Sequence, residues 1–387
     1  MDLPASVTTE IERCTLCGKC RSVCPVFEQT LGETTNARGR IRLLQAAMAG
    51  DLPVSRRFEL AVSTCLRCLR CQSVCPASLR IDEITLAARA RIVGPGARYA
   101  LGRFAARLVL PHRRAFSLAA SAVRGLRRLS GAVPPMPGGS AVRRWAGTPI
   151  DGSPRIGLFV GCLLDTVYPD VIEAVLDVCR RKGVGVVVPK GQVCCGTPAL
   201  ALGDGRLAER LVRRNAEAFL AAGVTTLVTA CGSCGQTMKD TWPRFAGRRW
   251  RDVRVLDFSE FAVEIGLPRA EGAAGRITYH DPCHLGFGQG VTEQPREVLR
   301  RTADLVEMDG ADRCCGSGGL FQVFHRDESR RIGDVKADAV AACDAPTVAT
   351  ACPACMMQIE ATLGRRGIER RVVHVASVLA DAMRQGE

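Results

Sequence analysis

Eighteen of the twenty cysteines in this 387-residue chain fall into four groups with regular spacing. Two groups follow the pattern C-x2-C-x2-C-x3-C-P and consist of Cys14, Cys17, Cys20 and Cys24, then Cys65, Cys68, Cys71 and Cys75. Four crowded thiolates before a proline are typical of proteins that bind [4Fe–4S] clusters. A structural zinc site is usually closed by two separated CxxC pairs instead. The pattern therefore predicts two cubane clusters in the N-terminal region.

The fourth cysteine of such a run ligates the cluster of the other run. We therefore expect two crossed ligand sets, one of Cys14, Cys17, Cys20 and Cys75, and one of Cys65, Cys68, Cys71 and Cys24. The proline after each fourth cysteine turns the chain so that this ligand can cross over.

The other two groups are copies of each other, offset by 120 or 121 residues. The first copy contains Cys162, Cys194, Cys195, Cys231 and Cys234, and the second contains Cys283, Cys314, Cys315, Cys352 and Cys355. Each copy is centred on a Cys-Cys-Gly turn and ends in a CxxC pair. Adjacent cysteines cannot readily bridge each other, but both can ligate one metal cluster. We therefore expect one metal site of five cysteines in each copy.

Few other residues are candidates for chemistry. Cys179 and Cys343 lie outside the four groups, and Cys179 falls on the apolar face of a predicted helix, where it would be a buried side chain. His280 and His284 flank Cys283 and could deliver a proton near a cluster. We favour a structural role, in which Asp281 and Pro282 cap a helix and the histidines hold the loop together.

The sequence around these groups predicts a multidomain protein. Residues 1–92 have apolar residues at helical spacing and predict an all-α ferredoxin-like domain with two [4Fe–4S] clusters. Residues 93–150 predict two amphipathic helices separated at Pro111 and a Pro/Gly-rich loop. Residues 151–268 and 269–387 each alternate strands with helices, which predicts two repeated α/β modules. Their cysteines follow the carboxyl ends of strands, where such folds bind ligands.

The excess of positive charge lies in the N-terminal part of the chain. Residues 1–150 contain 23 Lys or Arg and 9 Asp or Glu, whereas residues 151–387 contain 30 of each kind. An arginine-rich surface at residues 93–150 could contact a partner or a membrane, or it could be a solvated linker that packs its apolar side on a neighbouring domain. We expect no nucleic-acid partner, because aromatic residues are only 5% of the chain and no nucleic-acid motif is present.

The first ten residues, MDLPASVTTE, have neither the basic nor the apolar region of a secretory signal. We therefore expect a reduced, cytoplasmic protein that uses its cysteines as ligands, either free or peripheral on the inner face of the cell membrane.

The two C-x2-C-x2-C-x3-C-P runs, the ARGRI stretch after the first run, and the two CCG modules together resemble the iron–sulfur subunit of bacterial glycolate oxidase. The RGRIRLL stretch from Arg38 to Leu44 favours this branch over related lactate-utilisation, anaerobic glycerol-3-phosphate dehydrogenase and heterodisulfide reductase subunits. The resemblance implies an electron-transfer subunit whose FAD-binding flavoprotein partner oxidises glycolate or D-lactate, and which passes electrons toward a quinone-linked acceptor. No G-x-G-x-x-G follows a strand, so we expect no flavin or NAD on this chain.

The CCG modules leave two alternatives open. Both modules contain a complete set of five cysteines, as in heterodisulfide reductases. The modules of those enzymes hold noncubane [4Fe–4S] clusters that perform disulfide chemistry. That resemblance implies a disulfide reductase in which Cys195 and Cys315 are catalytic. In other relatives one module holds zinc, which implies a basic scaffold with structural zinc. Arg38 and Arg40 either donate hydrogen bonds near cubane sulfides or pair with acids.

Overall fold

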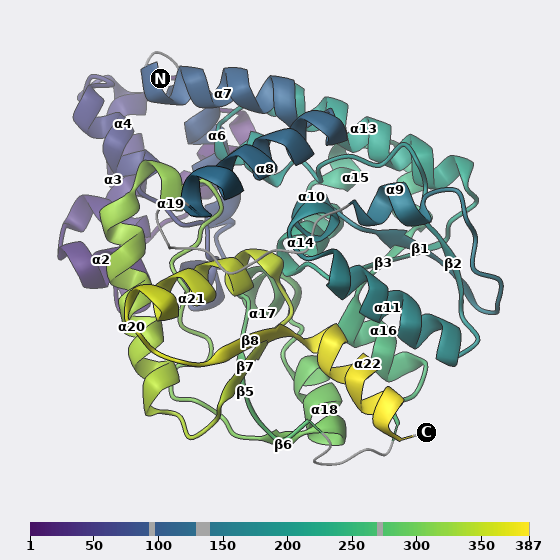
Figure 1. Ribbon diagram of the computed structural model, residues 1–387. Helices are drawn as coiled ribbons and strands as arrows, with labels where there is room; N and C mark the ends of the chain where they lie inside the picture. Colours follow the sequence, from purple (N-terminus) through teal and green to yellow (C-terminus); the bar gives the residue numbers. More distant parts are fainter. Residues whose placement is uncertain (93–96, 129–139, 269–273, 387) are drawn as a thin grey trace. The chain divides into compact units, whose positions relative to one another are not determined.

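The computed structural model describes residues 1–92, 97–128, 140–268 and 274–386. They form two units. The small unit comprises Met1–Arg107, Pro198–Leu207 and Arg313–Val335, and the large unit comprises Leu108–Thr197, Ala208–Asp312 and Lys336–Glu387. The predicted fold class is confirmed, since the N-terminal region is helical and each repeated module contains a parallel sheet (Figure 1).

The N-terminal region consists of short helices joined by the cysteine-rich loops. They are α1 (Ala5–Glu12), η1 (Lys19–Arg21), α2 (Pro25–Thr30), η2 (Glu33–Thr35), α3 (Ala37–Ala49), α4 (Arg56–Ser63), α5 (Arg70–Ser73) and α6 (Ile81–Ile92). Apolar residues of α1, α3, α4 and α6 pack into one core, which includes Ile11, Ile41, Leu44, Phe58 and Ile84. This core fixes the two cysteine-rich loops on its surface.

Helix α3 has clear start and stop signals. The side chain of Asn36 accepts a hydrogen bond from the backbone N–H of Gly39 at 3.1 Å, and Gly50 ends the helix in a left-handed conformation. A Cβ atom on Gly39 would lie 1.9 Å from the carbonyl oxygen of Glu33. Only glycine therefore lets the start of α3 approach the preceding loop so closely.

Residues 93–150 contain the two helices expected on either side of Pro111. They are α7 (Ala97–Val109) and α8 (Arg113–Arg128), followed by the short helix α9 (Ala141–Trp145). Most of the expected loop, residues 129–139, lies outside the described residues. The predicted domain limits at residues 92, 150 and 268 stay predictions.

The described strands form two four-stranded parallel sheets with the same topology. In the first module the order is β2-β1-β3-β4, with bounds β1 (Arg155–Phe159), β2 (Gly185–Val187), β3 (Thr226–Thr229) and β4 (Arg254–Asp257). In the second the order is β6-β5-β7-β8, with bounds β5 (Arg276–His280), β6 (Asp304–Leu305), β7 (Thr347–Thr350) and β8 (Arg371–His374). The internal repeat in the sequence is thus a structural repeat.

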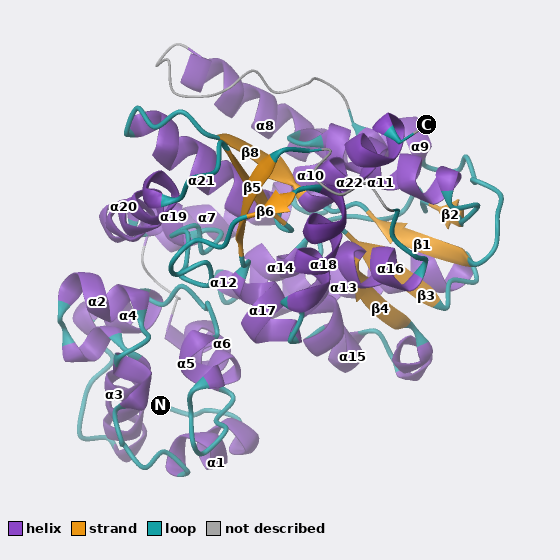
Figure 2. Ribbon diagram, turned by 90° about the horizontal axis from the view of Figure 1, so that it is seen from below, coloured by secondary structure: helices purple, strands orange, loops and turns teal. Residues whose placement is uncertain are grey.

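Helices surround both groups of strands, as Figure 2 shows. The first module contains α10 (Cys162–Thr166), α11 (Pro169–Arg181), α12 (Thr197–Ala201), α13 (Gly205–Ala221), α14 (Gly232–Asp240), α15 (Trp242–Phe245), η3 (Arg248–Asp252) and α16 (Phe258–Glu264). The second contains α17 (Cys283–Gln289), α18 (Glu293–Thr302), α19 (Phe321–Phe324), α20 (Arg326–Ala342), α21 (Pro353–Arg365) and α22 (Val375–Gln385).

The two modules pack against each other through reciprocal helix pairs within the large unit. Helix α11 packs on α22, α16 on α18, α14 on α17 and α10 on α21. A buried aromatic group strengthens the first module, because Trp242 lies edge-on to Phe159 at 5.6 Å and contacts Trp250 at 4.8 Å between ring centroids. These contacts fix the loops at the carboxyl ends of the strands.

Candidate metal-cluster sites

One cavity in the small unit is lined by Cys14, Cys17, Cys20 and Cys75. Cys14 follows α1, Cys20 lies in η1, and Cys75 follows α5. Cys17 is exposed and the other three are half-buried. The fold therefore brings Cys75 to the first run, as the crossed arrangement predicts. That these thiols bind iron stays a prediction.

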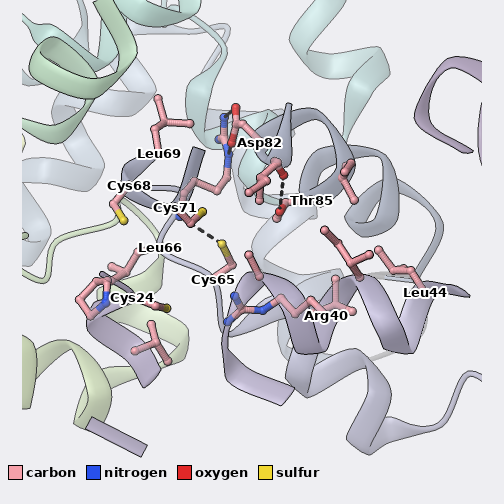
Figure 3. A pocket seen from close by; sticks show the side chains of 18 residues that line it. Cys24, Arg40, Leu44, Cys65, Leu66, Cys68, Leu69, Cys71, Asp82 and Thr85 are labelled. Atoms are coloured by element: carbon pink, nitrogen blue, oxygen red, sulfur yellow. Dashed lines mark hydrogen bonds and ion pairs between the residues drawn. The ribbon is translucent and has the colours of Figure 1, made fainter. Parts of the chain in front are cut away.

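A second cavity is lined by Cys65, Cys68 and Cys71 of the second run and by Cys24 of the first. Figure 3 shows these four side chains around one space, with Arg40 of α3 reaching toward Cys65. None of the twenty cysteines, all of which lie in described residues, forms a disulfide. Eight thiols thus gather in two groups of four, which is the donor set that two cubane clusters require.

The two cysteine runs share an unusual backbone conformation. The residue two positions after the first cysteine and the residue after the second are left-handed in both runs, with φ of 55° and 84° at Leu16 and Gly18, and 57° and 65° at Arg67 and Leu69. Such angles are uncommon for residues other than glycine. They direct backbone N–H groups to sulfur, and the N–H of Arg67 lies 3.4 Å from Sγ of Cys65. N–H groups that point at sulfur fit a bound thiolate.

Arg38 and Arg40 have different hydrogen-bond partners. The guanidinium of Arg38 pairs with Glu33 at 2.7 Å. Arg40 is buried, and it donates to the carbonyl oxygens of Ala61, at 2.8 Å, and Thr64. Burial by itself raises the pKa of Cys65, but the charges of Arg40 and Arg89 lower this pKa below its ordinary value.

The five cysteines of the first module form a continuous chain of thiol contacts in the large unit. In order along this chain they are Cys162, Cys194, Cys195, Cys234 and Cys231, each in hydrogen-bond contact with the next. Cys194, Cys195, Cys231 and Cys234 are buried. All five follow the carboxyl ends of β1, β2 and β3, as predicted. Five contacting thiols without a disulfide fit a multinuclear metal site.

Hydrogen bonds within this cluster divide the protons unevenly between the thiols. Contacts with Cys194 and Cys234 hold the pKa of Cys195 well below its ordinary value. Contacts with Cys162 and Cys195 raise the pKa of Cys194, and burial adds to this increase. Gly161 has φ of 72°, and a Cβ atom there would lie 3.4 Å from Sγ of Cys234. The glycine therefore lets the backbone approach the thiols closely.

Buried polar side chains that the sequence analysis missed hold the Cys194–Cys195 turn. Asn215 of α13 accepts a hydrogen bond from the N–H of Val193 at 2.7 Å and donates to the carbonyl oxygen of Cys194 at 3.0 Å. The indole N–H of Trp242 donates to the carbonyl oxygen of Cys195 at 3.0 Å. The sequence feature that could have indicated the role of Asn215 is a single asparagine in the middle of the amphipathic helix RLAERLVRRNAEAFLA.

The cysteines of the second module are divided between the two units. Cys283 begins α17, Cys352 precedes α21 and Cys355 lies in its first turn, all in the large unit. Cys314 and Cys315 belong to the small unit, where the N–H of Gly316 lies 3.4 Å from Sγ of Cys314. The site of the second module is therefore a prediction from the repeat.

In the small unit, the Cys314 turn lies against the second cubane set. Cys314 is part of one apolar cluster with Val26, Leu66, Phe321 and Ile332, and Cys24 and Cys68 pack against this cluster. A Cβ atom on Gly318 would lie 2.6 Å from Cδ2 of Leu66. The turn at Cys314 is therefore closely packed against the loop that carries Cys65 and Cys68.

The expectation for the loop around Cys283 needs correction. Helix α17 begins after Pro282, but no side chain caps it, and Asp281 instead pairs with Arg296 at 2.7 Å. His280 is buried beside this loop and lies close to the backbone of Ala311, so its structural role stays a prediction. Burial lowers the pKa of His280 to about 3. Cys179 is fully buried in α11, as predicted.

Comparisons with known proteins agree with this organisation. The model of a cysteine-rich domain named CCG matches residues 156–239 and 277–360, and that of a 4Fe-4S dicluster domain matches residues 10–79. A probable glycolate oxidase iron-sulfur subunit of Bacillus subtilis is 30% identical and covers 96% of this chain and 94% of its own length. A fumarate reductase (CoM/CoB) subunit of Methanothermobacter marburgensis is 32% identical over 96% of this chain and 72% of its own.

A shorter relative and a solved structure extend the comparison. Lactate utilization protein A of Geobacillus thermodenitrificans is 31% identical over 58% of this chain and 98% of its own length. A hypothetical protein from Helicobacter pylori has a solved structure with a TM-score of 0.54 and 9% identity, covering all of this chain and 73% of that one. The latter likeness concerns the fold alone.

Proposed function

Because this chain belongs to the family of the glycolate oxidase iron–sulfur subunit, we propose that it is the electron-transfer subunit of a flavin-dependent glycolate or D-lactate dehydrogenase. A flavoprotein partner would oxidise the hydroxy acid to the 2-oxo acid, which releases two electrons and two protons. A quinone-linked acceptor would take up both electrons and both protons. Bound iron–sulfur clusters supply the ability to carry single electrons between these two reactions.

The proposal assigns the ligands residue by residue. Cys14, Cys17, Cys20 and Cys75 would hold one cubane, and Cys24, Cys65, Cys68 and Cys71 the other. The five cysteines of each CCG module would hold a further cluster, and Asn215 and Trp242 would fix the first CCG turn around it. The left-handed turns at Leu16 and Arg67 would direct backbone N–H groups to the sulfur atoms.

One observation carries the electron-transfer role, namely that Cys24 and Cys68 pack against the apolar cluster that contains Cys314. The same apolar cluster links a CCG turn to a four-cysteine set within the small unit. An electron carrier needs its redox groups this close together. A scaffold with isolated structural zinc has no need of such a contact, so the contact favours electron transfer over the zinc scaffold.

A second candidate function is reduction of a disulfide at the CCG cysteines, with Cys195 and Cys315 as the reacting thiols. Both modules have complete sets of five cysteines, and the fumarate reductase relative supports this alternative. Replacement of either cysteine by alanine should then abolish disulfide reduction. Activity that survives both replacements would exclude this function.

The proposed partner is a separate flavoprotein, since the relatives are named as subunits or as parts of lactate utilization. For peripheral contact with a membrane we propose α7, where Leu101 and Phe104 are exposed one turn apart. No acidic residue lies between Glu83 and Asp151, which suits an anionic lipid surface. Within the described residues, no helix has the length and apolar character needed to cross a membrane.

The test is anoxic purification of the tagged chain from its native host, followed by dye reduction with glycolate, D-lactate, L-lactate and glycerol 3-phosphate. A co-purifying flavoprotein with hydroxy-acid-dependent activity would support the proposal and identify the substrate. Purification without a flavoprotein, together with disulfide reduction by the chain alone, would overturn it in favour of the second candidate.

A further inference from the structure

Three arginines are buried around the second four-cysteine set in the small unit. Arg40 comes from α3, Arg67 lies between Cys65 and Cys68, and Arg89 comes from α6; each is only 6% exposed. Arg40 and Arg67 line the same cavity as the four cysteines, and Figure 3 shows Arg40 there. Arg89 donates hydrogen bonds to the carbonyl oxygens of Cys65, at 2.6 Å, and Ser63, at 2.7 Å.

The three arginines are not matched by carboxylates. Arg67 forms a two-pronged ion pair with Asp82, at 2.7 and 2.9 Å. Among the described residues, Arg40 and Arg89 have no carboxylate partner and donate only to backbone carbonyl oxygens. The Nε–H of Arg89 is buried without any hydrogen-bond partner there. Two positive charges thus remain unbalanced in the interior.

Such charges are costly to bury, because they lose their hydration and gain no opposite charge. The cost falls if the same interior also contains negative charge. The four neighbouring cysteines would provide it as thiolates on a bound cluster. The two arginines are therefore placed to balance a negatively charged group in this cavity.

The first four-cysteine set has different surroundings, although its sequence pattern is the same. Its nearest arginine, Arg38, pairs with Glu33, and both side chains are partly exposed. Arg21 lies 3.4 Å from the same carboxylate. Cys17 is open to solvent. Lys19 also lines this cavity but is exposed, so positive charge near this set is either paired with a carboxylate or screened by water.

We propose that Arg40 and Arg89 raise the reduction potential of the cluster at Cys24, Cys65, Cys68 and Cys71 above that of the cluster at Cys14, Cys17, Cys20 and Cys75. This inference rests on the proposed ligand sets. Reduction adds one negative charge, and two nearby buried cations stabilise it. Burial alone would disfavour the added charge, but the same low dielectric strengthens its attraction to the cations.

The position of the second set gives this difference a function. Cys24 and Cys68 pack against the apolar cluster that contains Cys314 of the second CCG turn. An electron that resides preferentially at the second set is therefore held beside the CCG turn. The two N-terminal sets are then unequal, and the second is the one that lies beside the turn at Cys314.

The test is a redox titration of the anoxic, fully loaded chain, followed by electron paramagnetic resonance, with iron and acid-labile sulfide measured on every sample. The wild-type chain should show two separate midpoints for its cubane signals. A single shared midpoint would overturn the proposal without any variant. Absence of cubane signals would instead overturn the proposed function.

Arg40→Gln and Arg89→Gln remove one charge each and should lower the higher midpoint while the lower midpoint stays in place. Arg38→Gln is the matched control at the first set and should leave the higher midpoint unchanged. Arg89→Lys keeps the positive charge, so its higher midpoint should lie close to the wild-type value. Unchanged midpoints in both glutamine variants at full iron content would show that these arginines do not set the potential. If the glutamine variants fail to load, the wild-type midpoints remain the test.

Discussion

The backbone N–H of Gly232 donates a hydrogen bond to the carbonyl oxygen of Ala351 at 3.2 Å. Gly232 follows Cys231 of the first module, and Ala351 precedes Cys352 of the second. The side chains of Cys231 and Cys352 are also in hydrogen-bond contact. The two CxxC turns therefore meet inside the large unit.

His374 makes further hydrogen bonds at this junction. Its Nε2 atom lies 2.9 Å from the carbonyl oxygen of Ala230, and its Nδ1 atom accepts a hydrogen bond from the N–H of Ala376 at 3.1 Å. Pro353 occupies the position equivalent to Gly232 but has no N–H to donate. The histidine thus supplies the hydrogen bond that the proline cannot.

Replacement of His374 by alanine should lower the free energy of unfolding by about 2 to 4 kcal/mol, since it removes a helix cap, a buried hydrogen bond and side-chain volume. Asparagine can still cap α22 but is too short to reach Ala230, so His374→Asn should recover about 1 kcal/mol. Anoxic thermal unfolding of both variants measures the difference. An unchanged midpoint for His374→Ala would contradict the assigned junction.

The crossed ligand sets predict which cluster each fourth cysteine supports. Cys75→Ser should remove the cubane signal at Cys14, Cys17 and Cys20, and Cys24→Ser should remove the signal of the other set. Each variant should lose about 4 of the roughly 8 iron atoms of the N-terminal region. The two signals are told apart by their midpoints and by the effect of Arg89→Gln. If Cys75→Ser removes the cluster that Arg89 affects, the ligands are not crossed.

Asn215 predicts a link between stability and metal content in the first module. Its replacement by alanine leaves the N–H of Val193 and the carbonyl oxygen of Cys194 without their buried partner. The expected loss is about 2 to 5 kcal/mol of stability, together with lower metal content. Arg213→Ala, on the exposed side of the same helix, is the control. Equal metal content and unfolding midpoints in both variants would exclude this role.

Asp257 predicts a pH dependence of stability. Burial raises the pKa of this carboxyl group, which caps α16, to about 7. Between about pH 4 and 7 the folded chain keeps a proton that the unfolded chain has released, so the free energy of unfolding falls as the pH rises. Asp257→Asn retains the capping oxygen and has no charge. It should be more stable than the parent chain, by about 1 to 4 kcal/mol at pH 8.

The comparison of these two chains should be made by anoxic thermal unfolding from pH 5.5 to 8.5. The advantage of Asp257→Asn should grow up to about pH 7 and then level off. Asp338→Asn, at an exposed carboxylate that pairs with Arg366, is the matched control. A constant difference between Asp257→Asn and the parent chain across this range would contradict the raised pKa.

The repeated modules could be predicted from sequence because their signals are local. A short apolar strand precedes the cysteines, and helical periodicity follows, as at β1 and α11 or β7 and α21. The spacing of the N-terminal cysteines likewise suffices to predict that Cys24 joins the ligand set of the second run and Cys75 that of the first. Each of these features depends on residues that are close in the chain or on a fixed motif.

Other features depend on contacts between distant residues and have no local signal. The repeat places Cys314 with the second module, but Phe321 and Ile332 also pack it against Leu66 of the N-terminal region. Among the arginines whose side chains the structure describes, only Arg40, Arg67 and Arg89 are buried around the second cysteine set. The pairing of Asp281 with Arg296, rather than a helix cap, also depends on a residue in the next helix.

In the proposed function, this chain accepts electrons from the oxidation of a 2-hydroxy acid. The direct measurement is electron paramagnetic resonance of the anoxic complex with its co-purified flavoprotein, frozen shortly after addition of glycolate or D-lactate. Reduced-cluster signals should appear with one of these substrates, beginning with the signal that Arg89→Gln shifts, and should be absent without substrate. Full substrate oxidation with a dye acceptor, but no reduced-cluster signal when the dye is omitted, would show that the electrons do not pass through this chain.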